Sequence, residues 1–216
     1  VIVMQTTGIP AAEAPLGIEW SLGPAMPQYR KGGVFGEVDG LLVYAGGMQH
    51  PWREPEEALY LDPRSGLWAE TPAAPVGFGY TCGTSTGDAL YVLGGRNAGG
   101  RCFRLDRPGA EWRWTELPPL RQPRVFAAVA VVSHWLIAAG GGFGMKYGAF
   151  DPSPVSTVEA LDLAAPTQGW QELPHYPGID RPSPMGAACA GRLYMFGGHR
   201  SMEQGMTAPD GYLATH

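Results

Sequence analysis

Four short apolar runs along the chain each end in a pair of glycines, and they are the most regular feature of its hydrophobic pattern. The runs are Leu41–Gly47, Leu90–Gly95, Trp135–Gly141 and Leu193–Gly198. The first two intervals between successive pairs are nearly equal, and the third is somewhat longer. Short continuous apolar runs bounded by turn residues are typical of buried strands, and their recurrence at a nearly fixed period predicts a structural repeat.

Two further elements recur in step with the glycine pairs. A tryptophan precedes the first glycine at the same distance in Trp20–Gly46, Trp68–Gly94 and Trp114–Gly140, and Trp170–Gly197 differs from them by a single position. An apolar run that closes in Leu-Asp lies between a glycine pair and the next tryptophan, at Leu61-Asp62, Leu105-Asp106 and Leu161-Asp162. The three elements together define one repeating unit.

This unit resembles the kelch repeat, and the resemblance covers essentially the whole chain from Trp20 onward. It implies an all-β fold, a kelch-type β-propeller of four-stranded antiparallel blades, with about four blades' worth of chain. Each blade is expected to hold an inner strand of small residues, a fully buried second strand, a third strand ending at Leu-Asp and a fourth strand carrying the tryptophan. We expect the inner strands at 32–36, 77–80, 126–130 and 185–189.

The repeat also sets the expected domain limits. Residues 1–15 are expected to be irregular and residues 16–216 to hold the propeller repeats. The blade units are expected at about 28–72, 76–118, 122–174 and 183–216, the last completed by a strand at 16–25. Two arrangements stay open: an arc of a six- or seven-bladed propeller, of which the chain is a fragment, and a four-bladed ring closed by the N-terminal strand. The kelch resemblance favours the arc.

The third unit is longer than the others. The stretch from Gly140 to Trp170 exceeds the equivalent stretches Gly46–Trp68 and Gly94–Trp114. This difference predicts a long inserted loop after the second strand of the third unit.

Composition narrows the classes of function. With 44% hydrophobic and 16% charged residues the chain suits a globular protein, and its net charge of −5 without a Lys/Arg cluster argues against a nucleic-acid partner. No apolar stretch has the roughly 18 residues that a membrane span needs. The compartment stays open.

The residues that usually carry metal or cofactor chemistry are sparse. Cys82, Cys102 and Cys189 are expected to be buried free thiols, because they are too few and too scattered for a disulfide framework. The five histidines show no metal-ligand spacing with one another, so we expect no metal site. No P-loop or dinucleotide fingerprint is present, and we expect no cofactor.

Candidate binding residues gather where the topology would bring loops together. The loops after the second strands and the connections between blades lie at one end of such a propeller, where function usually resides. The candidate ligand-binding residues at this end are Arg30, His50, Trp52, Arg53, Arg96, Asn97, Arg101, Arg124, Lys146, Tyr147, Arg181, His199 and Arg200.

These residue types favour an anionic ligand. Arginine binds carboxylates through two parallel hydrogen bonds, and aromatic rings stack on sugar faces. We therefore expect a binding propeller whose loop end recognises a small acidic sugar or an acidic protein loop.

A narrower resemblance leaves an enzymatic alternative open. The stretches Ala139–Gly144 and Gly95–Arg101 are similar to stretches of bacterial kelch-type sialic acid mutarotases, also called N-acetylneuraminate epimerases. The resemblance implies that a loop glutamate and a loop arginine interconvert sugar anomers by acid–base catalysis. Arg101 stands where that arginine is expected, whereas Arg96 or Asn97 occupies the place of the glutamate. Glu203, on another loop, is the remaining carboxylate candidate.

Overall fold

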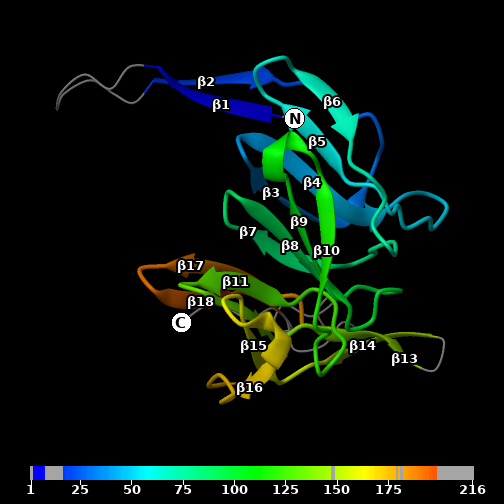
Figure 1. Cartoon of the computed structure of the whole chain (residues 1–216), viewed down its shortest axis with the longest axis vertical. Coiled ribbons are helices and arrows are strands. Elements are labelled where there is room, and N and C mark those ends of the chain that lie inside the picture. Colours follow the sequence, from blue (N-terminus) through cyan, green and yellow to red (C-terminus); the bar gives the residue numbers. More distant parts are fainter. Residues whose placement is uncertain (1, 8–16, 147–148, 179, 181, 199–216) are drawn as a thin grey trace, which may run out of the picture.

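The computed structural model describes residues 2–7, 17–146, 149–178, 180 and 182–198, and within them the chain is built almost entirely of antiparallel strands (Figure 1). Three four-stranded sheets follow one another along the chain. The first sheet, blade 1, contains β3 (Lys31–Val38), β4 (Leu41–Met48), β5 (Leu59–Asp62) and β6 (Leu67–Glu70). Blade 2 contains β7 (Cys82–Ser85), β8 (Ala89–Leu93), β9 (Cys102–Asp106) and β10 (Arg113–Leu117). Blade 3 contains β11 (Ala128–Val132), β12 (Trp135–Ala139), β15 (Val158–Asp162) and β16 (Gln171–Leu173).

Smaller elements complete the described part of the chain. Three two-stranded sheets are formed by β1 (Ile2–Thr7) with β2 (Gly17–Leu22), β13 (Gly142–Lys146) with β14 (Ala149–Pro154), and β17 (Met185–Cys189) with β18 (Arg192–Phe196). Short 3₁₀ turns stand at Pro108–Ala110 and Pro166–Gln168. The insertion expected in the third unit therefore contains the β13–β14 hairpin. The inner strands β3, β7, β11 and β17 contact one another in sequence, so the sheets stack around an axis as propeller blades do.

The glycine pairs form the joints between blades. The N–H of Gly47 donates to the carbonyl of Phe78 in the next blade at 2.7 Å, and the N–H of Gly95 donates to the carbonyl of Arg124 at 3.1 Å. A Cβ on Gly94 would stand 2.1 Å from the Arg124 oxygen, and the backbone at both Gly94 and Gly95 has positive φ. Only glycine allows this approach, so the pairs are fixed by blade-to-blade contact.

A second left-handed position recurs at one fixed distance ahead of each pair, at Gly32, Tyr80, Phe126 and Ser183. The φ values are 70°, 54°, 52° and 55°, and for the three side-chain-bearing residues this conformation costs about 1 to 3 kcal/mol each. It also interrupts the extended backbone. The inner strand expected at 77–80 therefore begins instead at Cys82, and the one expected at 126–130 begins at Ala128.

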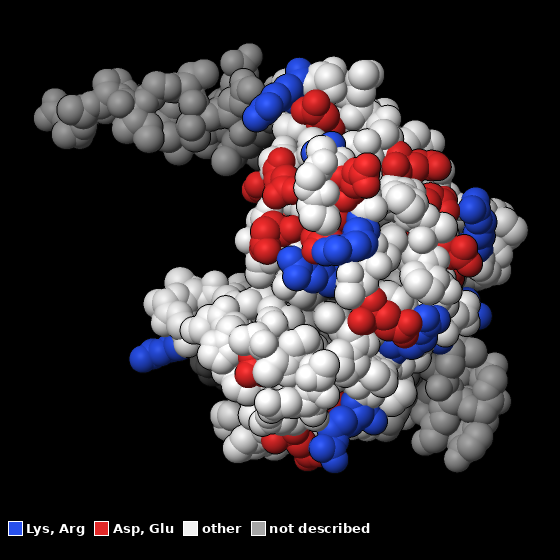
Figure 2. Space-filling view, in the orientation of Figure 1, with Lys and Arg blue, Asp and Glu red and all other residues white. Residues whose placement is uncertain are grey.

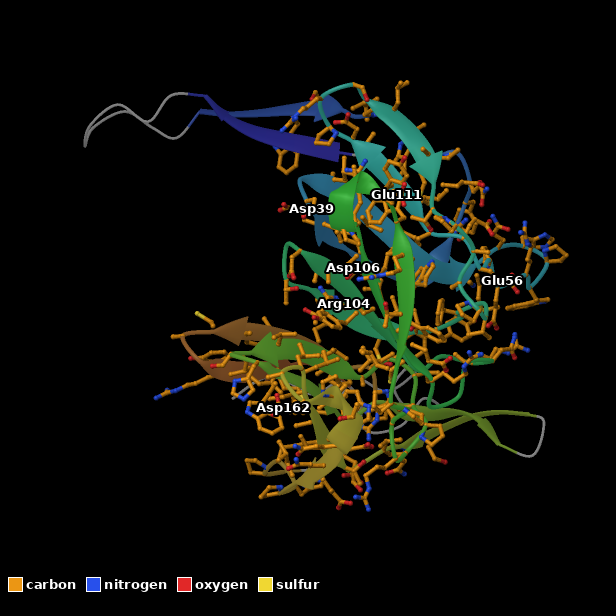
Figure 3. All side chains as sticks on the ribbon, viewed as in Figure 1. Asp39, Glu56, Arg104, Asp106, Glu111 and Asp162 are labelled. Carbon is orange, nitrogen blue, oxygen red and sulfur yellow. The ribbon has the colours of Figure 1, made fainter. Side chains whose placement is uncertain are left out.

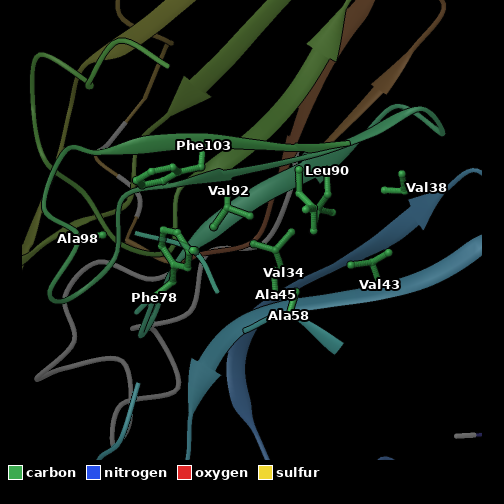
Figure 4. Close-up of a cluster of buried hydrophobic side chains, with 12 residues drawn as sticks. Val34, Val38, Val43, Ala45, Ala58, Phe78, Leu90, Val92, Ala98 and Phe103 are labelled. Carbon is green, nitrogen blue, oxygen red and sulfur yellow. The ribbon is translucent and has the colours of Figure 1, made fainter. Parts of the chain in front are cut away.

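Apolar side chains from neighbouring blades interlock between the sheets. Figure 4 shows the cluster between blades 1 and 2, where Val34 and Val43 face Phe78, Val92 and Phe103. The rings of Phe78 and Phe103 meet edge to face, with centroids 5.3 Å apart. Each blade thus buries its faces against its neighbours, as the repeat predicts.

The repeated tryptophans form hydrogen bonds that join each blade to the segment before it. Trp68 donates its indole N–H to the carbonyl of Pro24 (3.3 Å), Trp114 to Pro72 (3.0 Å) and Trp170 to Pro118 (2.7 Å). Pro72 and Pro118 follow the fourth strands of blades 1 and 2, so Pro24 marks β2 as the strand in the equivalent place ahead of blade 1.

The N-terminal region departs from expectation. Residues 2–7, expected to be irregular, form β1 and pair with β2 in register from Ile2–Leu22 to Thr7–Gly17. The strand expected at 16–25 was to complete the last blade, yet β2 pairs with β1 and lies well away from β17 and β18 in Figure 1. The backbone pairing of β2 is with β1, and the Trp68–Pro24 hydrogen bond joins the residue that follows β2 to blade 1. The third strand expected at 211–215 lies outside the described residues.

No helix in the described ranges is long and apolar enough to cross a membrane.

We predict that only one of the three cysteines reacts with a thiol reagent in the native protein. Burial raises the pKa of Cys82 to about 11 and that of Cys102 to about 12, whereas Cys189 is exposed, in contrast to the buried thiol expected there. Ellman's reagent at pH 8 should release one equivalent rapidly, and three in guanidinium. The Cys189→Ser variant should release none while folded; a fast-reacting Cys82 or Cys102 would contradict the burial described.

Candidate functional site

The loops that follow the second strands and the connections between blades lie at one end of the sheets, on the right of Figure 1. We call this end the loop face. It includes the segments 49–58 and 94–101 and the ends of β13 and β14, together with the connections 71–81 and 118–127 and the described residues 174–178, 180 and 182–184.

A hollow of about 160 Å³ opens on the loop face of blade 1, lined by Tyr29, Lys31, Met48, Gln49, His50 and Trp52. Tyr29 is 71% exposed and Trp52 is 66% exposed, and the Lys31 ammonium lies 5.8 Å from the centre of the Trp52 ring. The hollow therefore combines a cation with two accessible aromatic rings.

The loop that carries Trp52 is a tight turn. The Gln49 N–H donates to the Arg53 carbonyl at 2.8 Å, and the Trp52 N–H donates to the Gln49 carbonyl at 2.7 Å. Trp52 has a φ of 100°, a strained value for a bulky residue that is uncommon outside functional sites and tight turns. The Arg53 guanidinium is largely exposed and lies 3.6 Å from the Glu57 carboxylate, which also pairs with Arg30.

Two of the candidate arginines are built into the blades. The Arg124 side chain is fully buried, forms an ion pair with Glu159 and donates to the carbonyls of Gly140 (3.2 Å) and Thr157 (2.9 Å). Glu159 also accepts the backbone N–H groups of Arg121 (2.7 Å) and Gln122 (3.1 Å). The network ties the entry of the inner strand to the third strand of blade 3, and it leaves this guanidinium enclosed.

Arg30 has the corresponding place in blade 1. Its side chain is also fully buried, and it donates to the Glu57 carboxylate (3.0 Å), the Glu57 carbonyl (2.6 Å) and the Gln28 side chain (2.8 Å). Burial lowers the pKa of Arg30, and the charge of Glu57 opposes that shift. Arg30 and Arg124, expected among ligand-binding residues, are thus occupied by internal partners in this structure.

Blade 2 has Phe78 at the same position, and a carboxylate from blade 1 packs against the glycines on either side of it. A Cβ on Gly77 would stand 2.2 Å from the Glu54 carbonyl, and one on Gly79 would stand 2.6 Å from the Glu54 carboxyl carbon. Glu54 Oε2 accepts the Gly79 N–H at 2.9 Å. Among the described residues Glu54 Oε1 has no hydrogen-bond partner of good geometry, and the same holds for Nε of Arg96.

Glu54 therefore has an unusual environment for a carboxylate. Burial raises its pKa, while the Gly79 hydrogen bond, the charge of Arg96 and weak hydrogen bonding from Asn97 oppose the shift. Arg96 and Asn97 were expected at the loop end of the blades, whereas Glu54 was not. Gly77 and Gly79, on either side of Phe78 at the arginine position, were the signal that a neighbouring residue lies close to this segment.

Arg101 lies apart from that cluster. Its guanidinium forms a two-point pair with Glu116, at 2.8 and 3.0 Å, and stands 4.9 Å over the ring of Phe103. Both charged side chains are partly exposed on the outer strands of blade 2, and each shifts the other's pKa toward its ionised form.

The remaining candidates fall in or beside undescribed segments. Tyr147, Arg181, His199, Arg200 and Glu203 lie outside the described residues, and Lys146 is described only by its backbone pairing with Ala149 in the β13–β14 hairpin.

Charges elsewhere on the molecule are mixed. Figure 2 shows acidic and basic side chains interspersed on the face in view. At the opposite end from the loop face, Asp106 pairs with Arg104 (3.3 Å) and Arg113 (3.1 Å), away from Glu56 in Figure 3. The described residues hold no group of three or more His, Cys, Asp or Glu side chains suited to a metal ion.

Comparison with known proteins supports the fold and gives a partial link to one enzyme. No protein-family model matches the chain. Over 45 residues, 21% of this chain, it is 44% identical to N-acetylneuraminate epimerase of Haemophilus influenzae strain PittEE and, to the same extent, of strain 86-028NP. The matched stretch spans only 12% of the length of those relatives.

The solved structure of YjhT is similar over 91% of this chain and 68% of its own, with a TM-score of 0.72 and 16% sequence identity. This likeness confirms the expected kelch-type propeller architecture. The chain therefore has a kelch-propeller fold with distant, partial similarity to N-acetylneuraminate epimerase.

We predict that Arg124→Met destabilises the protein by about 3 to 5 kcal/mol, because it leaves the buried Glu159 carboxylate without its cation. Chemical unfolding followed by tryptophan fluorescence measures the loss. The matched control is Arg113→Met, which removes a mostly exposed partner of Asp106 and should cost below about 1 kcal/mol. Equal losses in the two variants would show that the Arg124 network does not hold blade 3 together.

Proposed function

We propose that this protein binds a small acidic sugar at the loop face of blade 1. The observation that carries the proposal is the hollow in which Lys31 and the rings of Tyr29 and Trp52 are accessible together. The ammonium of Lys31 pairs with the sugar carboxylate, and the aromatic rings pack against the apolar face of the sugar ring.

The size of the hollow favours a small ligand over a protein loop. At about 160 Å³ it can hold the carboxylate and one ring face of a single sugar, whereas a stable protein partner typically covers about 800 Å² of each surface. The similarity to N-acetylneuraminate epimerase supports the same class of ligand, because N-acetylneuraminate is an acidic sugar.

We predict that N-acetylneuraminate binds to the protein and that Lys31→Gln weakens binding about tenfold, since the lost charge-assisted contact is worth roughly 1.5 kcal/mol or more. Isothermal titration calorimetry at low salt measures the affinity, and Trp52→Ala should weaken it comparably.

The control is Arg64→Gln, which removes an exposed charge from the turn between β5 and β6 at the opposite end of blade 1. Equal weakening by Arg64→Gln would indicate a general electrostatic effect, and unchanged binding in Lys31→Gln and Trp52→Ala would remove the hollow as the site.

A second candidate function is sugar mutarotation, and the environment of Glu54 favours it. Opening the sugar ring requires a base to take the proton of the anomeric hydroxyl and an acid to protonate the ring oxygen as its bond to the anomeric carbon breaks. Closing the ring on the other face returns both protons. A carboxyl whose pKa is raised by burial, beside Arg96 and Asn97, suits this proton exchange.

We predict that the protein accelerates anomer equilibration of freshly dissolved N-acetylneuraminate and that Glu54→Gln lowers the rate at least 100-fold, within the usual range for acid–base catalysis. Proton NMR follows the two anomers. The rate should fall with decreasing pH through a midpoint above the ordinary range of a glutamate, because the base form of Glu54 is lost there.

Arg101→Ala is the informative comparison, since its guanidinium is held by Glu116. Loss of activity in Arg101→Ala with full activity in Glu54→Gln would move the chemistry to the start of β9. If the native protein does not accelerate anomer equilibration, mutarotation is excluded and sugar binding remains as the proposed function.

A further inference from the structure

The four left-handed positions just before or at the start of the inner strands share one backbone conformation but differ in their side chains. Gly32 has this conformation in blade 1 without strain, whereas the equivalent residues of the next blades are Tyr80, Phe126 and Ser183. All four stand at the same distance ahead of the first glycine of a pair. Glycine adopts this left-handed conformation without strain. Tyr80 and Phe126 adopt it although the conformation is unfavourable for residues with large side chains.

These residues lie against one another around the propeller axis. A Cβ on Gly32 would stand 3.0 Å from Cδ1 of Tyr80, and the ring centroids of Tyr80 and Phe126 are 5.1 Å apart with an interplanar angle of 43°. Both aromatic residues are half-buried. Successive blades therefore place a tilted aromatic pair at the loop-face end of the inner strands.

An axial cavity of about 360 Å³ adjoins this pair, within the size range of small-molecule sites. Phe126 and Ser183 line it together with Phe35 of β3, Thr81 and Cys82 at the start of β7, and Met185 of β17. Phe35 is 60% exposed and Met185 is 75% exposed. The described residues that line the cavity include no charged side chain.

This lining selects against an ionised ligand, because a charge entering the cavity meets no opposite charge there. It suits a ring that has both apolar C–H faces and hydroxyl groups: the aromatic side chains pack on the faces, and Ser183 and the backbone supply hydrogen bonds.

We infer that the axial cavity is a second binding site, for the ring of an uncharged pyranose, with Phe126 as its stacking residue and Tyr80 packed behind that ring. It differs in chemistry from the cationic hollow of blade 1, and it stands whether or not that hollow binds an acidic sugar.

The test exploits the backbone strain, since glycine at these positions removes the rings and relaxes the left-handed conformation together. Saturation-transfer-difference NMR is recorded with methyl α-D-glucopyranoside, methyl β-D-galactopyranoside and methyl α-D-mannopyranoside. We expect the native protein to bind at least one of them, and the Tyr80→Gly/Phe126→Gly double variant to lose at least 90% of the signal while its melting temperature stays within a few degrees.

Ser133→Gly is the matched control. Its φ of 57° is relaxed in the same way, but the residue lies at the β11–β12 turn, away from the loop face, so binding should stay unchanged. Phe126→Asn is a second variant for the case that the double variant does not fold, because asparagine tolerates the left-handed region. It too should lose most of the signal.

Three results would overturn the inference. They are absence of binding by all three pyranosides, retained binding in folded variants that lack the rings, and displacement of the pyranoside by N-acetylneuraminate, which would place both ligands in one site.

Discussion

The contact between a glycine pair and the backbone of the next blade is the constraint on which this structure depends. Gly94 comes so close to the carbonyl of Arg124 that a single methyl group would not fit between them, and the Gly95 N–H donates to the same carbonyl. The pair adopts left-handed backbone, and the chain it meets turns through a left-handed residue two positions later. The loops beyond each pair therefore leave at a fixed angle and at the same end, which is why the candidate binding residues share one face.

The contact between blades also determines which arginine side chains are buried in ion pairs and which cations remain exposed on the loop face. Where an arginine precedes the inner strand, as at Arg30 and Arg124, it forms a buried ion pair with a glutamate from its own blade. Blade 2 has Phe78 in place of this arginine, and Glu54 from the preceding blade packs against the neighbouring Gly77 and Gly79. Glu54 keeps one carboxylate oxygen without a good partner among the described residues, and burial raises its pKa. In blade 1, by contrast, Lys31 and the rings of Tyr29 and Trp52 line a hollow on the loop face.

The repeat predicted the fold because glycine pairs, Leu-Asp ends and tryptophans each meet a local physical need that recurs in every blade. It did not predict the start of β7, since a left-handed tyrosine has no sequence signature, nor the pairing of β1 with β2, because residues 2–7 lie outside the repeat. For the site, residue type and loop position singled out Trp52 and His50, and both line the hollow on the loop face. Residue type cannot tell an exposed arginine from one buried by a partner far along the chain, so Arg30 and Arg124 were grouped with the accessible cations.

The hydrogen bond from tryptophan to proline gives each unit a donor on one side and an acceptor on the other. Such a contact is head-to-tail: the surface that receives a neighbour differs from the surface that is received. Interfaces of this kind set no limit of their own on the number of members, and only the rotation between neighbours decides when an array closes on itself. Gene duplication of one blade would therefore lengthen the array without inventing a new interface, which gives the architecture an evolutionary freedom that two-fold symmetric assemblies do not have.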